Sequence, residues 1–146
     1  MASNIKYIFA VIFGILYLIF GITETLSGLV PAIADLTAPF MIPADIIGGL
    51  VLCVVGAVYL AALQRFTAGS GNGSAYLYVA MALSAIFGTV AVLSLAAQGT
   101  DLILFGDGEP WSPLALLVPM VYLAVLPAAA LSRWGRRFTG DLMGET

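Results

Sequence analysis

The chain has 146 residues, of which 62 % are hydrophobic and only 9 % charged, and its formal net charge is −3. Soluble domains contain roughly 45–50 % apolar and about 25 % charged residues. This composition excludes a soluble globular domain, a nucleic-acid-binding protein and a disordered chain.

The residue types that usually carry metal and redox chemistry are nearly missing. The sequence contains no histidine, so imidazole cannot bind haem, zinc, copper or iron. Its one cysteine, Cys53, cannot form an internal disulfide, and a single thiol cannot hold a zinc ion or an iron–sulfur cluster. Catalytic Ser-His-Asp and Cys-His arrangements are excluded by the same lack of histidine. We therefore expect no cofactor, no metal site and no enzymatic activity.

Four apolar segments each approach the ~20 residues that cross a bilayer core of about 30 Å. They cover residues 5–23, 45–63, 75–97 and 112–131. Apolar residues occupy every face of these segments, and backbone groups in lipid must be satisfied within a helix. The sequence therefore predicts an all-α integral membrane protein, in which residues 1–146 form a single four-helix transmembrane domain. No small-x-small cleavage pattern follows the first segment, so we expect it to be retained rather than removed as a signal peptide.

Charged residues are distributed unequally between the two sides of the predicted bundle. With four spans, both termini and the 64–74 loop lie on one side, and the 29–44 and 98–111 loops lie on the other. All five bases fall on the first side: Lys6, Arg65, Arg133, Arg136 and Arg137. Because basic loops stay in the cytoplasm, we predict a multi-pass cell-membrane protein with cytoplasmic N- and C-termini.

The middle of each predicted span lacks an ionisable residue. Glu24 directly follows the first span and is expected near the outer interface, where Asp45 can cap the second helix. Transporters coupled to protons or sodium need polar ligands near the midplane of the membrane. The sequence therefore disfavours such a transporter.

Small residues recur at helical spacing in three of the spans. The set comprises Gly14, Gly21 and Gly28 in and just beyond the first span, Gly49 and Gly56 in the second, and Ala80, Ser84 and Gly88 in the third. Positions four or seven residues apart lie close to one helix face, and small faces let membrane helices approach closely. We interpret these residues as helix-packing positions within the bundle, or as an interface for a partner helix or a second copy.

A cluster of basic and aromatic residues follows the fourth span, and it consists of Arg133, Trp134, Arg136 and Arg137. Such a cluster can anchor the chain at anionic lipid headgroups. The alternative is that these bases only set the topology.

The first two spans resemble the small four-helix DoxX-like membrane proteins, which have a glycine-punctuated first helix and a Gly-Gly or Glu-containing second helix. The segments that carry this resemblance are residues 14–21, GILYLIFG, and residues 47–56, IGGLVLCVVG, about a third of the chain with their flanks. Glu24 stands where those proteins would have a base. The resemblance implies a membrane protein that handles a lipid or a quinone.

These patterns lead to three functional hypotheses. The first is a non-catalytic subunit or scaffold that packs against a larger membrane complex, since midplane polar groups and metal ligands are missing. The second is a homo-oligomeric carrier or channel for a small or apolar solute, with a cavity near Pro119 and Pro127 lined by Ser84, Thr89 and Tyr122. The third is a DoxX-like lipid- or quinone-handling protein, in the form of an enzyme that acts on the lipid or quinone at the outer face through Glu24 and Asp45. The expected partners are the bilayer and either a larger complex or a second copy, and not nucleic acid.

Overall fold

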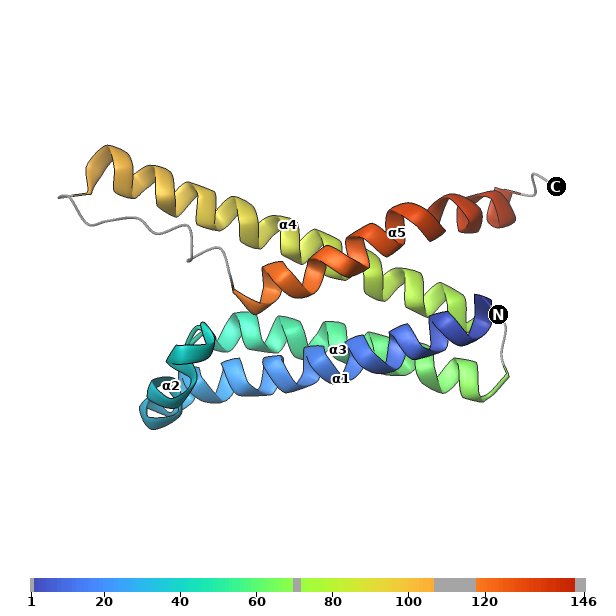
Figure 1. Cartoon of the computed structure of the whole chain (residues 1–146), viewed down its shortest axis with the longest axis horizontal. Coiled ribbons are helices and arrows are strands. Elements are labelled where there is room, and N and C mark those ends of the chain that lie inside the picture. The colour runs from blue at the N-terminus through green and yellow to red at the C-terminus, as the bar shows by residue number, and fades with distance from the viewer. Residues whose placement is uncertain (1, 70–71, 107–117, 144–146) are drawn as a thin grey trace.

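The computed structural model describes residues 2–69, 72–106 and 118–143, with side chains for those between 4 and 135. All regular elements in these ranges are helical (Figure 1). They are α1 (Ala2–Leu29), α2 (Pro31–Thr37), the 3-10 helix η1 (Ala38–Phe40), α3 (Ile46–Thr67), α4 (Gly73–Phe105) and α5 (Pro119–Met143).

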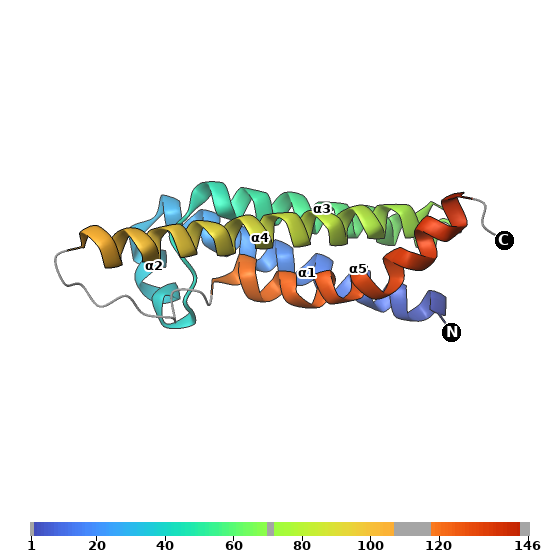
Figure 2. The ribbon, with the colours of Figure 1, turned by 90° about the horizontal axis from the view of Figure 1, so that it is seen from above.

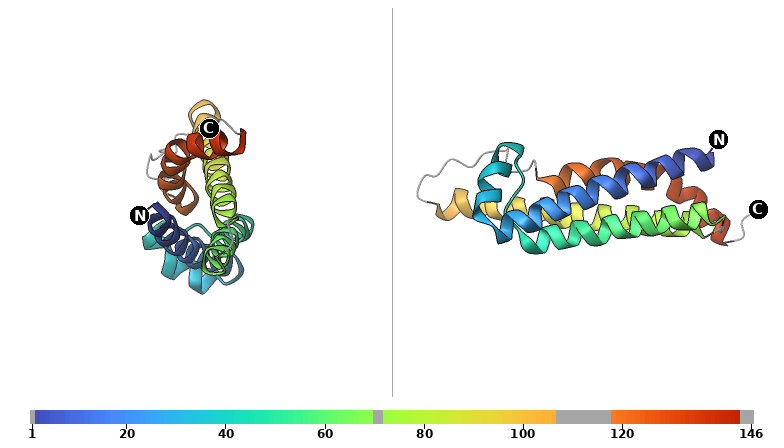
Figure 3. Two further views of the ribbon diagram at one scale, coloured as in Figure 1. Left: turned by 90° about the vertical axis from the view of Figure 1, so that its right-hand side faces the viewer. Right: turned by 90° about the horizontal axis from the view of Figure 1, so that it is seen from below.

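The four long helices follow one another around an arc, as the end-on view in Figure 3 shows. α1 and α3 are antiparallel and form the most extensive contact, α3 packs on α4, and α5 packs mainly on α4 (Figures 1 and 2). The beginnings of α1 and α4 and the ends of α3 and α5 lie at one end of the molecule, which we call the terminal end. The opposite end carries α2, the start of α3 and the end of α4, and we call it the α2 end.

α1 is longer than the predicted span of residues 5–23, and the segment that follows Thr23 is helical as far as Leu29. The hydroxyls of Thr23, Thr25 and Ser27 donate to carbonyls four residues earlier, at 2.7–2.8 Å. These hydroxyls therefore need no solvent, and polar residues continue the helix instead of ending it. Ser27 also hydrogen-bonds the Thr37 hydroxyl at 2.9 Å, which holds α2 against α1.

α3 and α4 also exceed their predicted bounds of 45–63 and 75–97. α3 continues through Gln64 and Arg65 and stops before Gly69, whose φ of 67° a helix cannot accommodate. The prediction of a loop over residues 98–111 is wrong as far as Phe105, because α4 ends only at Gly106. The Thr100 hydroxyl donates to a carbonyl one turn back, so this polar residue fits within the helix.

Three described helices are long and apolar enough to cross a membrane: Asn4–Leu29, Ile46–Thr67 and Gly73–Phe105. The fourth predicted span, residues 112–131, begins outside the described residues. Its described part belongs to α5, which starts at Pro119 and continues through Arg133 to Met143. The fourth span therefore stays a prediction.

The core lies between α1, α3 and α4 and is unusually rich in tyrosine. Tyr17 and Tyr59 are 1 % and 0 % exposed, whereas the isoleucines of α1 face outward. The outward-facing set, each about half exposed, is Ile5, Ile8, Ile12, Ile15, Ile19 and Ile22. Large aliphatic side chains on the surface and tyrosine hydroxyls in the core suit a protein surrounded by lipid better than one surrounded by water.

Candidate functional site

The glycines of α1 and α3 lie in the contact between these two helices. A Cβ on Gly21 would lie 2.7 Å from the Cys53 amide nitrogen and 2.8 Å from the Gly49 carbonyl oxygen. A Cβ on Gly56 would lie 3.0 Å from the Leu18 nitrogen. Gly14 and Gly28 likewise face side chains of α3 or the segment before it. The glycines therefore let two backbones of the same chain approach closely.

The small residues of α4 are also covered by the chain itself. Ala80 and Ser84 are 0 % and 1 % exposed and belong to the buried side of α4. Gly88 faces α5, where an added Cβ would overlap the Cβ of Ala124. Because each of these positions meets another helix of this chain, none supplies an argument for a partner helix.

A cluster of hydroxyls lies in the middle of the core, where Tyr59 and Ser84 are hydrogen-bonded at 3.1 Å. Ser84 also donates to the Ala80 carbonyl at 2.9 Å. The Tyr17 ring stacks on the Tyr59 ring with centroids 5.7 Å apart, and the Tyr17 hydroxyl is buried without a partner. The sequence analysis did not group these residues, because they come from three different helices.

Glu24 lies in α1 and is only 3 % exposed, so the expectation of a position directly after the first helix is wrong. The helix continues for more than one turn after Glu24, to Leu29, and the Glu24 carboxylate lies between α1 and α3. One of its oxygens, Oε2, is buried and has no hydrogen-bond partner. Glu24 is three residues after Gly21 and four before Gly28, and this spacing puts it on the glycine face of the helix. That spacing was the available sequence signal.

Asp45 is the N-cap of α3, as the sequence predicts, and its Oδ1 accepts from the Ile47 amide at 3.0 Å. Its other oxygen reaches Gly48, where a Cβ would lie 2.5 Å from Asp45 Oδ2 and 2.8 Å from Glu24 Oε1. The two carboxylates therefore flank the same point on α3, and the missing side chain of Gly48 makes room for both.

These carboxylates line a cavity of about 550 Å³ at the α2 end, which we call the α2-end cavity. Its volume is within the range of roughly 300–1,000 Å³ typical of small-molecule sites. Glu24, Asp45, Ser94 and Gln98 supply its polar atoms. The remaining lining residues are Pro43, Ile47, Gly48, Val51, Phe87, Val90, Ala91, Leu95, Val118 and Met120. The cavity is thus mostly apolar, and two carboxylates form part of its wall.

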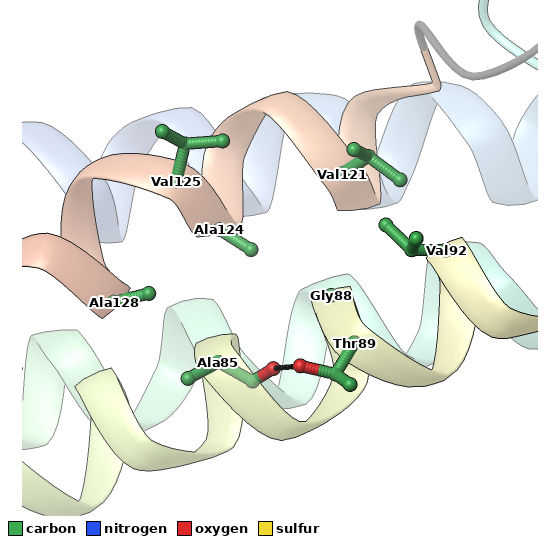
Figure 4. A pocket seen from close by; sticks show the side chains of 8 residues that line it. All are labelled: Ala85, Gly88, Thr89, Val92, Val121, Ala124, Val125 and Ala128. Atoms are coloured by element: carbon green, nitrogen blue, oxygen red, sulfur yellow. Dashed lines mark hydrogen bonds between the residues drawn. The ribbon is translucent and has the colours of Figure 1, made fainter.

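A second hollow of about 230 Å³ lies between α4 and α5, close to where the sequence predicts a cavity (Figure 4). Of the predicted lining residues, Thr89 is there, but its hydroxyl donates to the Ala85 carbonyl at 2.7 Å. Ser84 instead bonds Tyr59, and the Tyr122 ring packs edge-on against Phe20 at 5.7 Å. Apart from Thr89, whose hydroxyl hydrogen is donated within α4, the side chains drawn in Figure 4 are small and apolar.

Among the described side chains, no group of three or more His, Cys, Asp or Glu could hold a metal ion. Cys53 is a free thiol, half-buried in α3 beside Gly21.

Residues 1–135 match the model of the MJ0565 integral membrane domain family. The chain belongs to this family. It is similar to uncharacterized protein MJ0565 from Methanocaldococcus jannaschii, with 25 % identity over 128 residues, 85 % of this chain and 87 % of that protein. No solved structure matches. The family match and the three apolar helices make this chain an integral membrane protein in contact with the lipid bilayer.

The basic cluster at the end of α5 is only partly described. The Trp134 ring is half-buried and packs edge-on against Phe9 at 5.5 Å, and its carbonyl accepts from the Tyr78 hydroxyl at 2.9 Å. Arg133 is exposed, and the side chains of Arg136 and Arg137 lie outside the described ones. Trp134 thus joins α5 to α1 and α4 in this member of the MJ0565 family, and lipid headgroup binding by the arginines stays a prediction.

Proposed function

We propose that this chain is a non-catalytic membrane protein that binds an apolar or amphipathic small molecule in the α2-end cavity, as a carrier does. The observation that carries this proposal is the cavity itself, which has the volume of a ligand site and a mostly apolar wall. The non-catalytic part rests on the sequence, which has no histidine and a single cysteine. We retain α5 as the fourth span and the terminal end as the cytoplasmic one, because all five bases belong to that end.

Filling the cavity tests this proposal. Ala91 lines the cavity from α4 and is half-buried, so Ala91→Phe places a ring in the space that a ligand needs. We expect this variant to bind the neutral probe 4-phenylbutanol about tenfold more weakly, which corresponds to about 1.4 kcal/mol. Calorimetric titration of the protein in nanodiscs, with empty nanodiscs as the blank, measures this difference.

The matched control is Ala96→Phe on the same helix, since Ala96 is exposed and does not line the cavity. It adds the same ring to the lipid-facing surface and is expected to leave binding unchanged. Equal weakening by both variants, or no binding to the unaltered protein, would show that the cavity is not a ligand site.

A subunit of a larger membrane complex is the second candidate, and the end of α4 favours it. This end projects past the beginning of α5 (Figure 1), and Ile103, Leu104 and Phe105 are 72 %, 66 % and 79 % exposed. Gentle extraction followed by native-gel separation and mass spectrometry of the band tests this role. We expect a larger subunit at fixed stoichiometry if the role is correct, and a band of this chain alone if it is wrong.

A further inference from the structure

Glu24 lines the α2-end cavity and has a buried carboxylate oxygen without a hydrogen-bond partner. The residue is only 3 % exposed, and the oxygen without a partner is its Oε2. Burying a carboxylate without a hydrogen-bond donor or a positive charge is strongly unfavourable. An unsatisfied buried oxygen in a folded protein needs an explanation, and a donor bound in the adjoining cavity supplies one.

In the part of the chain that the structure describes, no base lies near this oxygen. Lys6 precedes Glu24 by eighteen residues on the same helix, about 27 Å along its axis. Arg65 lies in the last turn of α3, where its guanidinium is over the Tyr76 ring at 5.4 Å. The three other bases belong to the later part of α5, at the terminal end. The charge at the α2 end is therefore acidic only.

The geometry points to a ligand with one protonated primary amine on an apolar body, and we propose this class of compound for the α2-end cavity. The inference rests on the proposed function and names its ligand chemistry. An ammonium group has three N–H donors and no acceptor. The Glu24 carboxylate, whose Oε2 has no partner and whose Oε1 flanks Gly48, accepts one of them. Asp45 Oδ2, which flanks Gly48 beside that Oε1, accepts another. The apolar body lies against Val51, Phe87 and the other aliphatic lining residues.

A divalent metal ion fits this wall less well than an amine. Calcium takes six to eight oxygen ligands, and magnesium requires an octahedral set. Among the described residues, two carboxylates meet here, and no group of three or more His, Cys, Asp or Glu is found. The aliphatic remainder of the cavity has no role in holding a bare ion, whereas it suits the body of an amine.

Three probes with the same phenylbutyl body and different headgroups test the inference: 4-phenylbutylamine, 4-phenylbutanol and 4-phenylbutanoate. We expect the unaltered protein in nanodiscs to bind the amine about tenfold more tightly than the alcohol, and the carboxylate least. In Glu24→Gln, which keeps the side-chain shape, the amine is expected to bind no more tightly than the alcohol. Asp35→Asn is the matched control, because it removes an exposed acid of α2 that does not line the cavity.

Asp45→Asn gives an independent reading if Glu24→Gln does not fold. Asparagine is as good an N-cap as aspartate, so the start of α3 is retained while one charge leaves the cavity. We expect the preference for amine over alcohol to fall several-fold in this variant. An unchanged preference in Asp45→Asn together with a loss in Asp35→Asn would assign the effect to general surface charge and overturn the inference.

The remaining outcomes separate this inference from the proposed function. If the amine and the alcohol bind equally and Ala91→Phe weakens both, the amine inference is wrong and the proposed function stands. If Glu24→Gln weakens all three probes by the same factor, Glu24 only shapes the cavity and the inference is again wrong. If no probe binds to the unaltered protein, both proposals fail.

Discussion

Gly49→Ala is expected to destabilise the folded chain by about 2 kcal/mol, because an added methyl group has no room between α1 and α3. Its Cβ would lie 2.5 Å from the Thr25 amide nitrogen and 2.7 Å from the Gly21 carbonyl oxygen. Both are backbone atoms and cannot rotate away, so the two helices must separate. This separation would weaken the packing of α1 on α3, the most extensive helix contact in the molecule.

Cys53 reports on this contact directly, since it is half-buried one turn after Gly49 and beside Gly21. We expect the variant to have a lower midpoint of thermal unfolding in detergent, followed through the reaction of Cys53 with a thiol-reactive fluorophore. The thiol should also react faster below the midpoint, because separation of α1 from α3 exposes it.

Gly135→Ala is the matched control for the same chemical change in a helix. Among the described side chains, the nearest atom to a Cβ on Gly135 is a Leu131 methyl carbon at 3.8 Å, an ordinary contact. Without a clash, replacing glycine by alanine in a helix stabilises it by up to about 1 kcal/mol. Opposite signs for the two variants support the packing interpretation, and a stabilising Gly49→Ala would contradict it.

The sequence predicts the fold class and the helix centres well, since an all-round apolar segment in lipid can only be a helix. It predicts the helix ends poorly. The predicted spans stop at residues 23 and 97, but the helices continue beyond them. The hydroxyls of Thr23, Thr25 and Thr100 each donate to a carbonyl of their own helix. A membrane helix can therefore continue through residues that a hydropathy scale treats as loop.

The inside of the bundle is harder to predict than its elements. In a soluble helix the apolar face marks the core, but lipid removes that distinction, and the isoleucines of α1 face outward while Tyr17 faces inward. Glycine spacing is the remaining guide, and the glycines of α1 lie on the face that meets α3. The same spacing includes Glu24, whose burial becomes evident once the helix is known to run to Leu29.

The α2-end cavity could not be predicted from the sequence because its wall comes from four helices. Glu24, Asp45 and Ala91 are far apart in the chain and meet only through the packing of α1, α3 and α4. The predicted cavity between α4 and α5 rested on prolines, yet Pro119 and Pro127 are both fully buried. A proline in a membrane helix is therefore a weak guide to an open space, whereas a carboxylate on a glycine face is a better one.

Tyr59→Ala is expected to have the largest effect on stability, about 3–5 kcal/mol, as for a buried aromatic side chain replaced by alanine. The Tyr59 ring is fully buried and stacks with Tyr17, and it lies 6.0 Å from the Phe13 ring. Its removal leaves a cavity at the centre of the aromatic cluster. The thermal unfolding assay with Cys53 measures the loss.

Two further variants show whether the effect comes from the ring of Tyr59, from its hydroxyl, or from the loss of any tyrosine. Tyr59→Phe keeps the ring and removes only the hydrogen bond to Ser84, so we expect a loss of about 1 kcal/mol. Tyr76→Ala removes an exposed ring from α4, whose contact with Arg65 stabilises by about 0.5–1 kcal/mol. If Tyr59→Ala cost no more than Tyr76→Ala, the aromatic cluster would not hold the bundle together. A large loss in Tyr59→Ala with a small one in Tyr59→Phe would show that the packing of the rings supplies most of the stabilisation. Such packing is important in a membrane, because lipid provides no hydrophobic driving force between helices.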